Sequence, residues 1–446
     1  MRQSDADAAE TPIRRTHNQL PHGAVRSLPG AVEGATGRNQ TLDENRLIIH
    51  GDCLERMREM DTESVDAIIT DPPYGLSFMG KEWDNFGSDT RQPGDEHYHN
   101  PENAFGRAKV RYGYGSKLRD SMVAFQEAMT PVFAEALRVA KSGAHLLCFG
   151  GTRTFHRMTC AIEDAGWDIR DCIMWTYGSG MPKSMDLGRA LEKGGEANAA
   201  DIERWSGWGT CLKPAWEPII VARKPLDGTV AHNVLEHGVG ALNIDACRVP
   251  SAPHDSSREG EESAERSYGD RGATNFHNRP GPRGGDERGR FPANLVHDGS
   301  DEVREAFGEA AGQLANLREG IPMRHANCYG KPNPTTKEYE RHVEDDKCAA
   351  RFFYCAKANK EDRNLGGVEN VHPTVKPNEL MRWLVRLVCP KGGLVLDPFC
   401  GSGSTGVACL DEGMRFVGIE REESYCEISR ARLEAAWARN AQMTLF

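Results

Sequence analysis

The sequence predicts an α/β fold built around a parallel sheet. Apolar residues recur at helical spacing over residues 122–137, and the apolar segment 144–149 that follows is short enough to be a strand. Two other short apolar segments, 65–70 and 394–396, are typical of buried strands. Alternating strands and amphipathic helices form parallel sheets, whose ligands bind beyond the carboxyl ends of the strands. The residues that follow each predicted strand are therefore the candidates for a functional site.

Length and composition bound the class of protein. The 446 residues can hold two or three domains, or one domain with large insertions. No apolar run is long enough to span a bilayer and no secretory leader is visible, so we expect a soluble, cytoplasmic protein without membrane contact. The 13 cysteines contain no C-x-x-C pair and suit a reducing compartment, and we predict no metal site. The net charge of −11 disfavours nucleic acid as a partner, so binding of phosphates would depend on local basic residues.

The chain divides into four regions by pattern. Residues 1–43 are polar and without periodicity, so we expect a disordered N-terminal tail. Regular strand and helix patterns occupy residues 44–224 and 366–446. Residues 225–365 are rich in Gly, Pro, Arg and Asn, and their segment near 251–290 is Gly- and Arg-rich and expected to be disordered. That segment is either a basic strand-tracking region or a solvated linker.

The loop after the apolar segment 65–70 combines an acid, two prolines and an aromatic residue. Pro72 and Pro73 have no N–H and fix their own φ, so the loop is stiff and its carbonyls stay free to accept hydrogen bonds. Asp71 adds an acceptor-only carboxylate. Together they could hold both hydrogens of an exocyclic amine, while Tyr74 offers a face for base stacking worth about 1–3 kcal/mol. An ordinary proline turn explains the same residues when they are taken alone.

A glycine-rich loop, 397–406, follows the apolar segment 394–396. Its glycines at positions 401, 403 and 406 fit the pattern G-x-G-x-x-G, and a helical run follows. Glu420 ends the next predicted strand, 19 residues after Gly401. This spacing is close to that of a carboxylate that binds ribose hydroxyls, so the loop indicates a nucleotide-type cofactor, including a dinucleotide.

Two further segments provide weaker candidates. The sequence His-Pro-Thr-Val-Lys-Pro at 372–377 precedes an amphipathic helix, for which Asn378 is the expected N-cap. Thr374 and Lys376 would then lie before the positive end of that helix, a place suited to a carboxylate, although a surface lysine in a turn is the plainer interpretation. A predicted strand at 47–49 also runs into Asp52 and Cys53, which carry no information alone.

Taken together, these segments resemble the DNA amino-methyltransferases, which methylate adenine N6 or cytosine N4 with S-adenosylmethionine. The loops 71–74 and 397–403 match the two signature motifs, and their order resembles the permuted beta group. The resemblance implies a Rossmann-like, doubly wound methyltransferase sheet that is circularly permuted, with residues 44–224 as its catalytic half and 366–446 as its cofactor-binding half. The irregular region 225–365 would then be an inserted target-recognition region.

The resemblance also implies the roles of residues and the partners. The target base would be flipped out of double-stranded DNA, its amine held by Asp71 and the Pro72 carbonyl, and the amine would attack the sulfonium methyl in line. A homodimer and a companion restriction nuclease are compatible with the family, and the sequence decides neither. The implied catalytic residues are Asp71, Pro72, Pro73 and Tyr74, and the implied cofactor-binding residues are Asp52, Cys53, Thr374, Lys376, Asp397, Pro398, Phe399, Gly401, Gly403, Thr405 and Glu420.

Four alternatives stay open at this point. Asp71 favours adenine N6 as the target, because cytosine N4 relatives often carry Ser at that position, and cytosine N4 is the alternative. A catalytically silent DNA-binding protein of the same fold would keep the central region, but the two intact loops argue against it. A nicotinamide-dependent oxidoreductase would not need the 71–74 loop, and RNA or protein amide methyltransferases more often carry Asn in place of Asp71.

Overall fold

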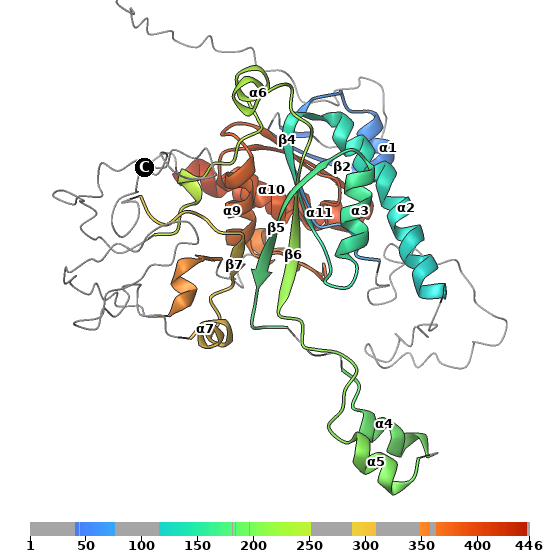
Figure 1. The fold of residues 1–446 in the computed structure, drawn as a ribbon. Coiled ribbons are helices and arrows are strands. Elements are labelled where there is room, and N and C mark those ends of the chain that lie inside the picture. The colour runs from blue at the N-terminus through green and yellow to red at the C-terminus, as the bar shows by residue number, and fades with distance from the viewer. Residues whose placement is uncertain are drawn as a thin grey trace, which may run out of the picture.

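The computed structural model describes residues 41–43, 45–75, 116–180, 182, 184–195, 197–250, 288–308, 348–356 and 363–443. Within these ranges a ten-stranded sheet has the order β1-β2-β10-β9-β3-β4-β6-β5-β7-β8 (Figure 1). The strands are β1 (Thr41–Asp43), β2 (Arg46–His50), β3 (Val65–Thr70), β4 (Ala140–Phe149), β5 (Asp168–Thr176), β6 (Trp216–Arg223), β7 (Leu295–His297), β8 (Tyr354–Cys355), β9 (Leu394–Asp397) and β10 (Arg415–Glu420).

Helices cover both faces of this sheet, as a doubly wound fold requires (Figure 1). One face packs against α1, α2 and α3, and the other against α9, α10 and α11. The helices are α1 (Cys53–Arg58), α2 (Ser116–Val139), α3 (Phe155–Asp164), α4 (Leu187–Gly194), α5 (Ala199–Trp205), α6 (Val230–His237), α7 (Asp301–Phe307), α9 (Asn378–Val388), α10 (Ser404–Asp411) and α11 (Glu423–Met443), with short 3-10 turns η4 (Asp245–Cys247), η5 (Ala349–Phe352) and η6 (Leu365–Gly367). None of the described helices combines the length and the apolar character that a bilayer crossing demands.

The predicted α/β fold is confirmed, but the sheet is mixed rather than purely parallel. Strands β2, β10, β9, β3 and β4 run parallel to one another. Strand β6 runs antiparallel to both β4 and β5, and β1 runs antiparallel to β2. An apolar pattern identifies a strand without giving its direction, which explains why the antiparallel strands were not predicted. The last two strands of the chain, β9 and β10, lie between β2 and β3.

Two segments predicted to be disordered contain residues that pair with the sheet or with a neighbouring segment. The tail was predicted to reach residue 43, yet Thr41–Asp43 pairs with β2, while residues 1–40 lie outside the described part. The Gly- and Arg-rich segment near 251–290 also lies outside it up to residue 287. Its last residue, Arg290, forms a bridge with Val249, and the Arg288 guanidinium pairs with Asp245. Backbone pairing to a neighbouring segment, which composition does not reveal, orders both ends.

The region 225–365 contributes to the sheet as well as to loops. Strand β7 pairs in parallel with β5, and β8 pairs in parallel with β7, so both extend the sheet beyond β5. The same interval also holds α6 and α7. The interval is therefore partly built into the same sheet, and its predicted role in target recognition stays a prediction.

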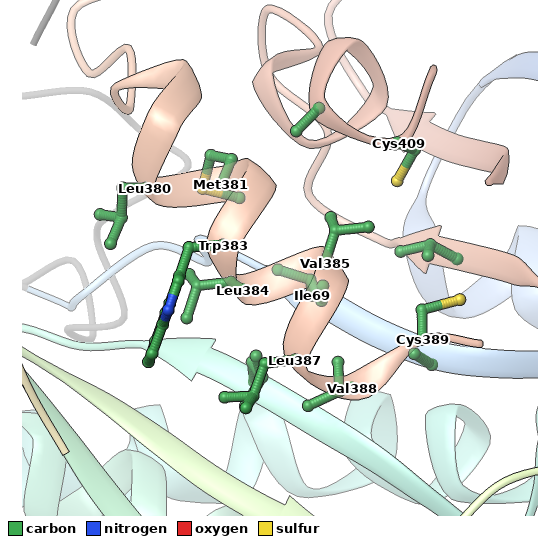
Figure 2. Packing of buried hydrophobic residues seen from close by; sticks show 14 of the residues in the cluster. Ile69, Leu380, Met381, Trp383, Leu384, Val385, Leu387, Val388, Cys389 and Cys409 are labelled. Atoms are coloured by element: carbon green, nitrogen blue, oxygen red, sulfur yellow. The ribbon is translucent and has the colours of Figure 1, made fainter. Parts of the chain in front are cut away.

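Helix α9 packs against the sheet through an almost continuous apolar face. Trp383, Leu384 and Leu387 are buried there, and Figure 2 shows them pointing toward the strands below. The Trp383 ring stacks on Tyr354 with centroids 5.3 Å apart. Each such side chain stabilises the fold by about 1.5–3 kcal/mol when fully buried. This packing fixes the helix that follows the Lys376 segment.

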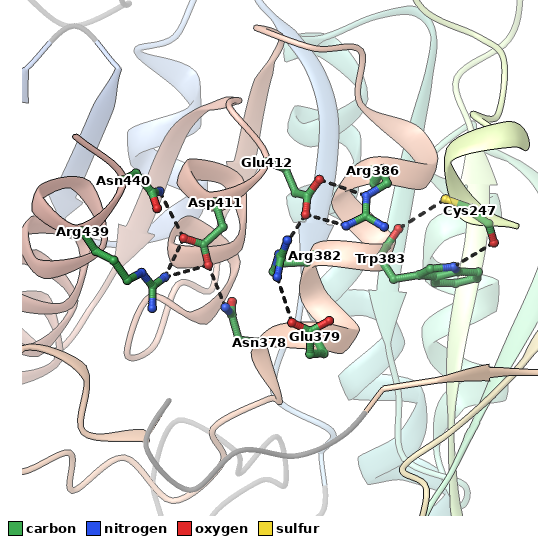
Figure 3. A network of polar contacts seen from close by, with 10 residues as sticks. All are labelled: Cys247, Asn378, Glu379, Arg382, Trp383, Arg386, Asp411, Glu412, Arg439 and Asn440. Carbon is green, nitrogen blue, oxygen red and sulfur yellow. Dashed lines mark hydrogen bonds and ion pairs between the residues drawn. The ribbon is translucent and has the colours of Figure 1, made fainter. Parts of the chain in front are cut away.

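Polar contacts join the other side of α9 to the end of α10, which is bonded in turn to α11 (Figure 3). The Glu412 carboxylate accepts from Arg382 Nε at 2.8 Å and from Arg386 Nη2 at 2.6 Å. Asp411 accepts from Asn378 Nδ2 at 2.8 Å and from Arg439. The expectation that Asn378 caps the helix is wrong: Pro377 is the N-cap, and Asn378 begins the helix with its side chain bonded to α10. The helix begins one residue earlier than predicted, so Asn378 lies inside its first turn and its Nδ2 donates to α10.

Between β5 and β6 the chain leaves the body as an arm that carries α4 and α5, seen at the bottom of Figure 1. Backbone hydrogen bonds close the stalk of this arm, from Tyr177 N to Ala215 O and from Leu187 N to Trp208 O, each 3.0 Å long. Residues 177–180 begin this stalk directly after the end of β5.

A candidate active site at the carboxyl edge of the sheet

A pocket of about 450 Å³ opens where β2, β3, β9 and β10 end. This volume falls within the usual range of small-molecule sites, about 300–1,000 Å³. The pocket brings the 71–74 loop and the glycine-rich loop together, although more than 300 residues separate them in sequence. All of the predicted site residues line it except Asp397, Gly403 and Thr405. The juxtaposition follows from the sheet order, because β9 lies directly beside β3.

The carboxylate of Asp71 is already engaged by two neighbours. Its Oδ1 accepts from the Tyr74 hydroxyl at 2.7 Å, and its Oδ2 lies 3.1 Å from Lys376 Nζ. Pro72, which lies between Asp71 and Tyr74 in the loop, is buried. Burial, together with the charges of Asp71 and Glu217, raises the pKa of Tyr74 well above its ordinary value, so this hydroxyl stays protonated at neutral pH. A carboxylate has about four acceptor directions, so Asp71 can still accept from a ligand.

Lys376 lies at the centre of this cluster, with its side chain 9% exposed. Its ammonium contacts Glu217 Oε2 at 2.8 Å, Asp71 Oδ2 at 3.1 Å and the Tyr74 hydroxyl at 3.3 Å. Burial alone would lower the pKa of Lys376, but the two carboxylates outweigh it and raise the pKa, so the group carries a charge. The ammonium thus lies against the 71–74 loop. Its predicted contact with a methionine carboxylate stays a prediction.

Glu217 is a pocket residue that the sequence analysis missed. It lies one residue inside the start of β6. Because β6 is antiparallel to its neighbours, its start lies at the same edge as the carboxyl ends of the parallel strands. An acid at the beginning of an antiparallel strand would have been a candidate if the strand direction had been known.

The glycine-rich loop approaches the ligand side of the pocket through its backbone. Gly401 has φ +55°, and a Cβ there would come within 2.9 Å of His372 Nε2. Its N–H donates to Glu420 Oε2 at 2.7 Å. Burial raises the pKa of Glu420 to about 7, although three backbone N–H groups oppose the shift. A glycine at close approach beside such a carboxylate has the chemistry of a ribose site.

Three predicted cofactor residues support the pocket from behind. Asp397 is 2% exposed, and its two oxygens accept from the hydroxyls of Thr70 at 2.7 Å and Thr405 at 2.6 Å. Burial raises its pKa to about 6 despite these hydrogen bonds. Gly403 has φ +79° and caps α10, where a Cβ would press on Leu433. These residues join the end of β3, the end of β9 and the start of α10, so they fix the two loops relative to each other.

Two neutral rings, His372 and Tyr425, also line the pocket. His372 lies edge-on to Tyr425, with ring centroids 4.6 Å apart, and neither residue was among the predicted site residues. Burial lowers the pKa of His372 to about 4, so the ring is uncharged at neutral pH. Asp52 caps α1 by accepting from Leu54 N at 3.0 Å, and Cys53 lies next to it with a pKa raised by burial to about 12. The His372 motif supplied the only sequence signal for these two rings.

Comparison with known proteins agrees with this geometry. The family model of the N6/N4 DNA methylases matches residues 65–431. The Type II methyltransferase M.HindIII of Haemophilus influenzae is 23% identical over 392 residues, covering 86% of this chain and 94% of its own. M2.DpnII of Streptococcus pneumoniae, also a Type II methyltransferase, is 47% identical over 64 residues, covering 14% of this chain and 24% of its own.

Solved structures are similar at low levels. The M1.HpyAVI–SAM complex has a TM-score of 0.36 at 15% identity, and covers 87% of this chain and 98% of its own. The cytosine-N4-specific PvuII DNA methyltransferase has a TM-score of 0.41 at 12% identity, and covers 89% and 92%. These scores are too low to support a functional conclusion, which rests instead on the family model. That model spans well over half of the sequence, so the chain belongs to the S-adenosylmethionine-dependent N6/N4 DNA methylase family.

Proposed function

We propose that this protein transfers a methyl group from S-adenosylmethionine to N6 of an adenine that is flipped out of double-stranded DNA. The observation that carries the proposal is the shared pocket. The acidic Asp71 loop and the Gly401 loop line one cavity at the carboxyl edge of the sheet. A group that holds an amine and a group that holds a nucleoside cofactor therefore lie within reach of each other. The Type II names of the relatives support a role in site-specific DNA modification.

The described residues fit the cofactor. S-adenosylmethionine, when bound, supplies a methyl group activated by a sulfonium. The Glu420 carboxylate would accept from ribose hydroxyls, and Gly401 would allow the backbone to approach, since its missing Cβ leaves the space before His372 open. Asp52 and the neutral rings of His372 and Tyr425 would border the adenine. Two neutral, partly buried rings beside a carboxylate suit a nucleoside.

Asp71 and the Pro72 carbonyl would hold the two hydrogens of the target amine. This orientation turns the nitrogen lone pair toward the methyl group, so positioning supplies most of the rate enhancement. Tyr74 would stack on the base, which costs a few kcal/mol to flip out of the duplex. The hydroxyl of Tyr74 bonded to Asp71 fixes the ring next to the carboxylate. After transfer, the amine releases one proton, which Asp71 accepts and passes to water.

We also propose that the domain is circularly permuted. Strands β9 and β10, which carry the cofactor loops, come last in the chain but lie inside the sheet between β2 and β3. This arrangement supports the permuted beta order, in which the catalytic half precedes the cofactor-binding half. Homodimerisation and a companion nuclease are separate proposals, and nothing in the described residues bears on them.

One experiment tests both the activity and the base. Duplex DNA of varied sequence would be incubated with the protein and isotopically labelled S-adenosylmethionine. The DNA would then be digested to nucleosides and analysed by mass spectrometry. The expected product is labelled N6-methyladenine. Labelled N4-methylcytosine would overturn the adenine assignment and support the alternative target. Absence of label in both bases, with cofactor binding intact, would overturn the proposed function.

A further inference from the structure

The Glu217–Lys376 pair lies beside the catalytic loop but has no part in the mechanism above. Glu217 Oε2 is 2.8 Å from Lys376 Nζ, a shorter contact than the 3.1 Å from Lys376 to Asp71. The Lys376 side chain is 9% exposed, and those of Asp71 and Glu217 are 20% and 23% exposed. Ion pairs at this depth are screened less by water than surface pairs are. Their charges therefore act on whatever occupies the pocket.

The charges of Asp71, Glu217 and Lys376 do not cancel. Two carboxylates and one ammonium leave one net negative charge, since the Tyr74 hydroxyl is neutral. Without Glu217, Asp71 and Lys376 would neutralise each other. The ammonium would also be free to draw closer to Asp71 and occupy its acceptor oxygens. Glu217 thus leaves the cluster with one net negative charge and Asp71 with uncommitted acceptor oxygens.

The position of Glu217 is fixed from several sides. Its neighbour Pro218 is buried and pairs across the sheet with Met174 of β5. The hydroxyl of Tyr177, at the end of β5, bonds to the Glu217 carboxylate. The Lys376 ammonium also lies 4.6 Å from the centre of the Phe149 ring, a cation–π contact that holds it on the β4 side. Glu217 and Lys376 are therefore held in place before any ligand binds.

The reaction moves positive charge toward this cluster. As the nitrogen–carbon bond forms, the carbon–sulfur bond breaks, and sulfur leaves as a neutral thioether with the bonding electron pair. The positive charge passes to the amine nitrogen, which then loses a proton to Asp71. A fixed negative charge beside the nitrogen stabilises this shift more in the transition state than in the ground state.

We propose that Glu217 is a positioning residue that draws the Lys376 ammonium away from Asp71 and leaves the base-binding end of the pocket with one net negative charge. This inference rests on the proposed methyl transfer. Glu217 touches neither the base nor the cofactor in this role, and acts through Lys376. A purely structural pair would stabilise the fold without changing the rate of the chemical step.

The test first removes the charge of Glu217 and then restores the net charge of the cluster with a second substitution. In Glu217→Gln the cluster becomes neutral, so we expect kcat at saturating cofactor and DNA to fall about 10- to 100-fold. The cofactor Kd from calorimetry should stay within about twofold, because no cofactor contact is removed. In the double variant Glu217→Gln with Lys376→Met, Asp71 again carries the one net negative charge. Its kcat should therefore exceed that of Glu217→Gln.

The matched control is Glu63→Gln. Glu63 pairs with Lys224 at 3.2 Å at the opposite end of β6 and outside the pocket, so this variant should keep the wild-type kcat. Thermal unfolding of all variants shows whether a lower kcat comes from an unfolded protein or from a slower chemical step. A wild-type kcat in Glu217→Gln, or a double variant no faster than Glu217→Gln, would overturn the inference. An inactive wild-type protein would instead refute the proposed function itself.

Discussion

Carboxylates whose charge depends on burial dominate the site at the scale of single residues. Burial raises the pKa of Glu420 to about 7 and that of Asp397 to about 6, while Asp71 shares a buried ammonium with Glu217. Asp397 keeps two hydroxyl donors, and Glu420 keeps backbone donors with space for a ligand. The first is therefore a structural acceptor, and the second is available for binding.

The raised pKa of Glu420 predicts a pH dependence of cofactor binding. A ribose hydroxyl donates to the ionised carboxylate, so binding should weaken below pH 7, approaching about tenfold per pH unit well below the pKa. The effect on the free energy of unfolding has the opposite sign. Because the pKa of Glu420 is raised in the folded state, its stabilising contribution is full below the ordinary carboxyl pKa and is lost as pH rises through 7. Calorimetry between pH 6 and 8 measures the affinity.

The control for this prediction is Glu420→Gln. The amide cannot ionise, so its cofactor affinity should be lower than that of the wild type at pH 8 and nearly flat over the same range. If the wild-type affinity is equally flat, Glu420 does not bind the ribose in its ionised form.

At the scale of elements, helix α9 connects packing to chemistry. Its apolar face is buried on the sheet, its charged face is bonded to the end of α10, and Lys376 precedes its first residue by two positions. The sequence predicted this helix from its periodic apolar residues, and it also predicted β3 with the bounds Val65–Thr70 that the structure has. Both predictions depend on local periodicity. The error at Asn378 is an error of one residue in where the helix begins, since Pro377 is its N-cap.

Truncation of a core side chain of α9 tests the packing. Leu384 is fully buried, so Leu384→Ala should lower the free energy of unfolding by about 2–5 kcal/mol, measured by denaturant titration. The matched control is Leu235→Ala on α6, where Leu235 is 88% exposed and the expected change is within about 0.5 kcal/mol. Equal effects of the two substitutions would show that α9 does not carry the core described above.

At the scale of the whole molecule, the site is produced by the order and direction of the strands. The sequence predicted which loops bind, because signature residues follow apolar strands, and the pocket brings those loops together. It did not reveal Glu217, since the antiparallel direction of β6 comes from its return through the α4–α5 arm. Nor did it show that Asp397 faces Thr70, a contact made across 327 residues. Local patterns thus identify the loops, and long-range pairing decides their neighbours.

The central claim, that Asp71 orients an amine toward a cofactor held by a separate loop, is tested most directly by Asp71→Ala. Methyl transfer to duplex DNA and cofactor affinity would be measured on the same preparation. The control is Asp61→Ala, because Asp61 is exposed and lies before β3. We predict that transfer falls at least about 100-fold in Asp71→Ala. The cofactor Kd should stay within about threefold of the wild type. Near-normal transfer, or loss of cofactor binding together with transfer, would contradict the claim.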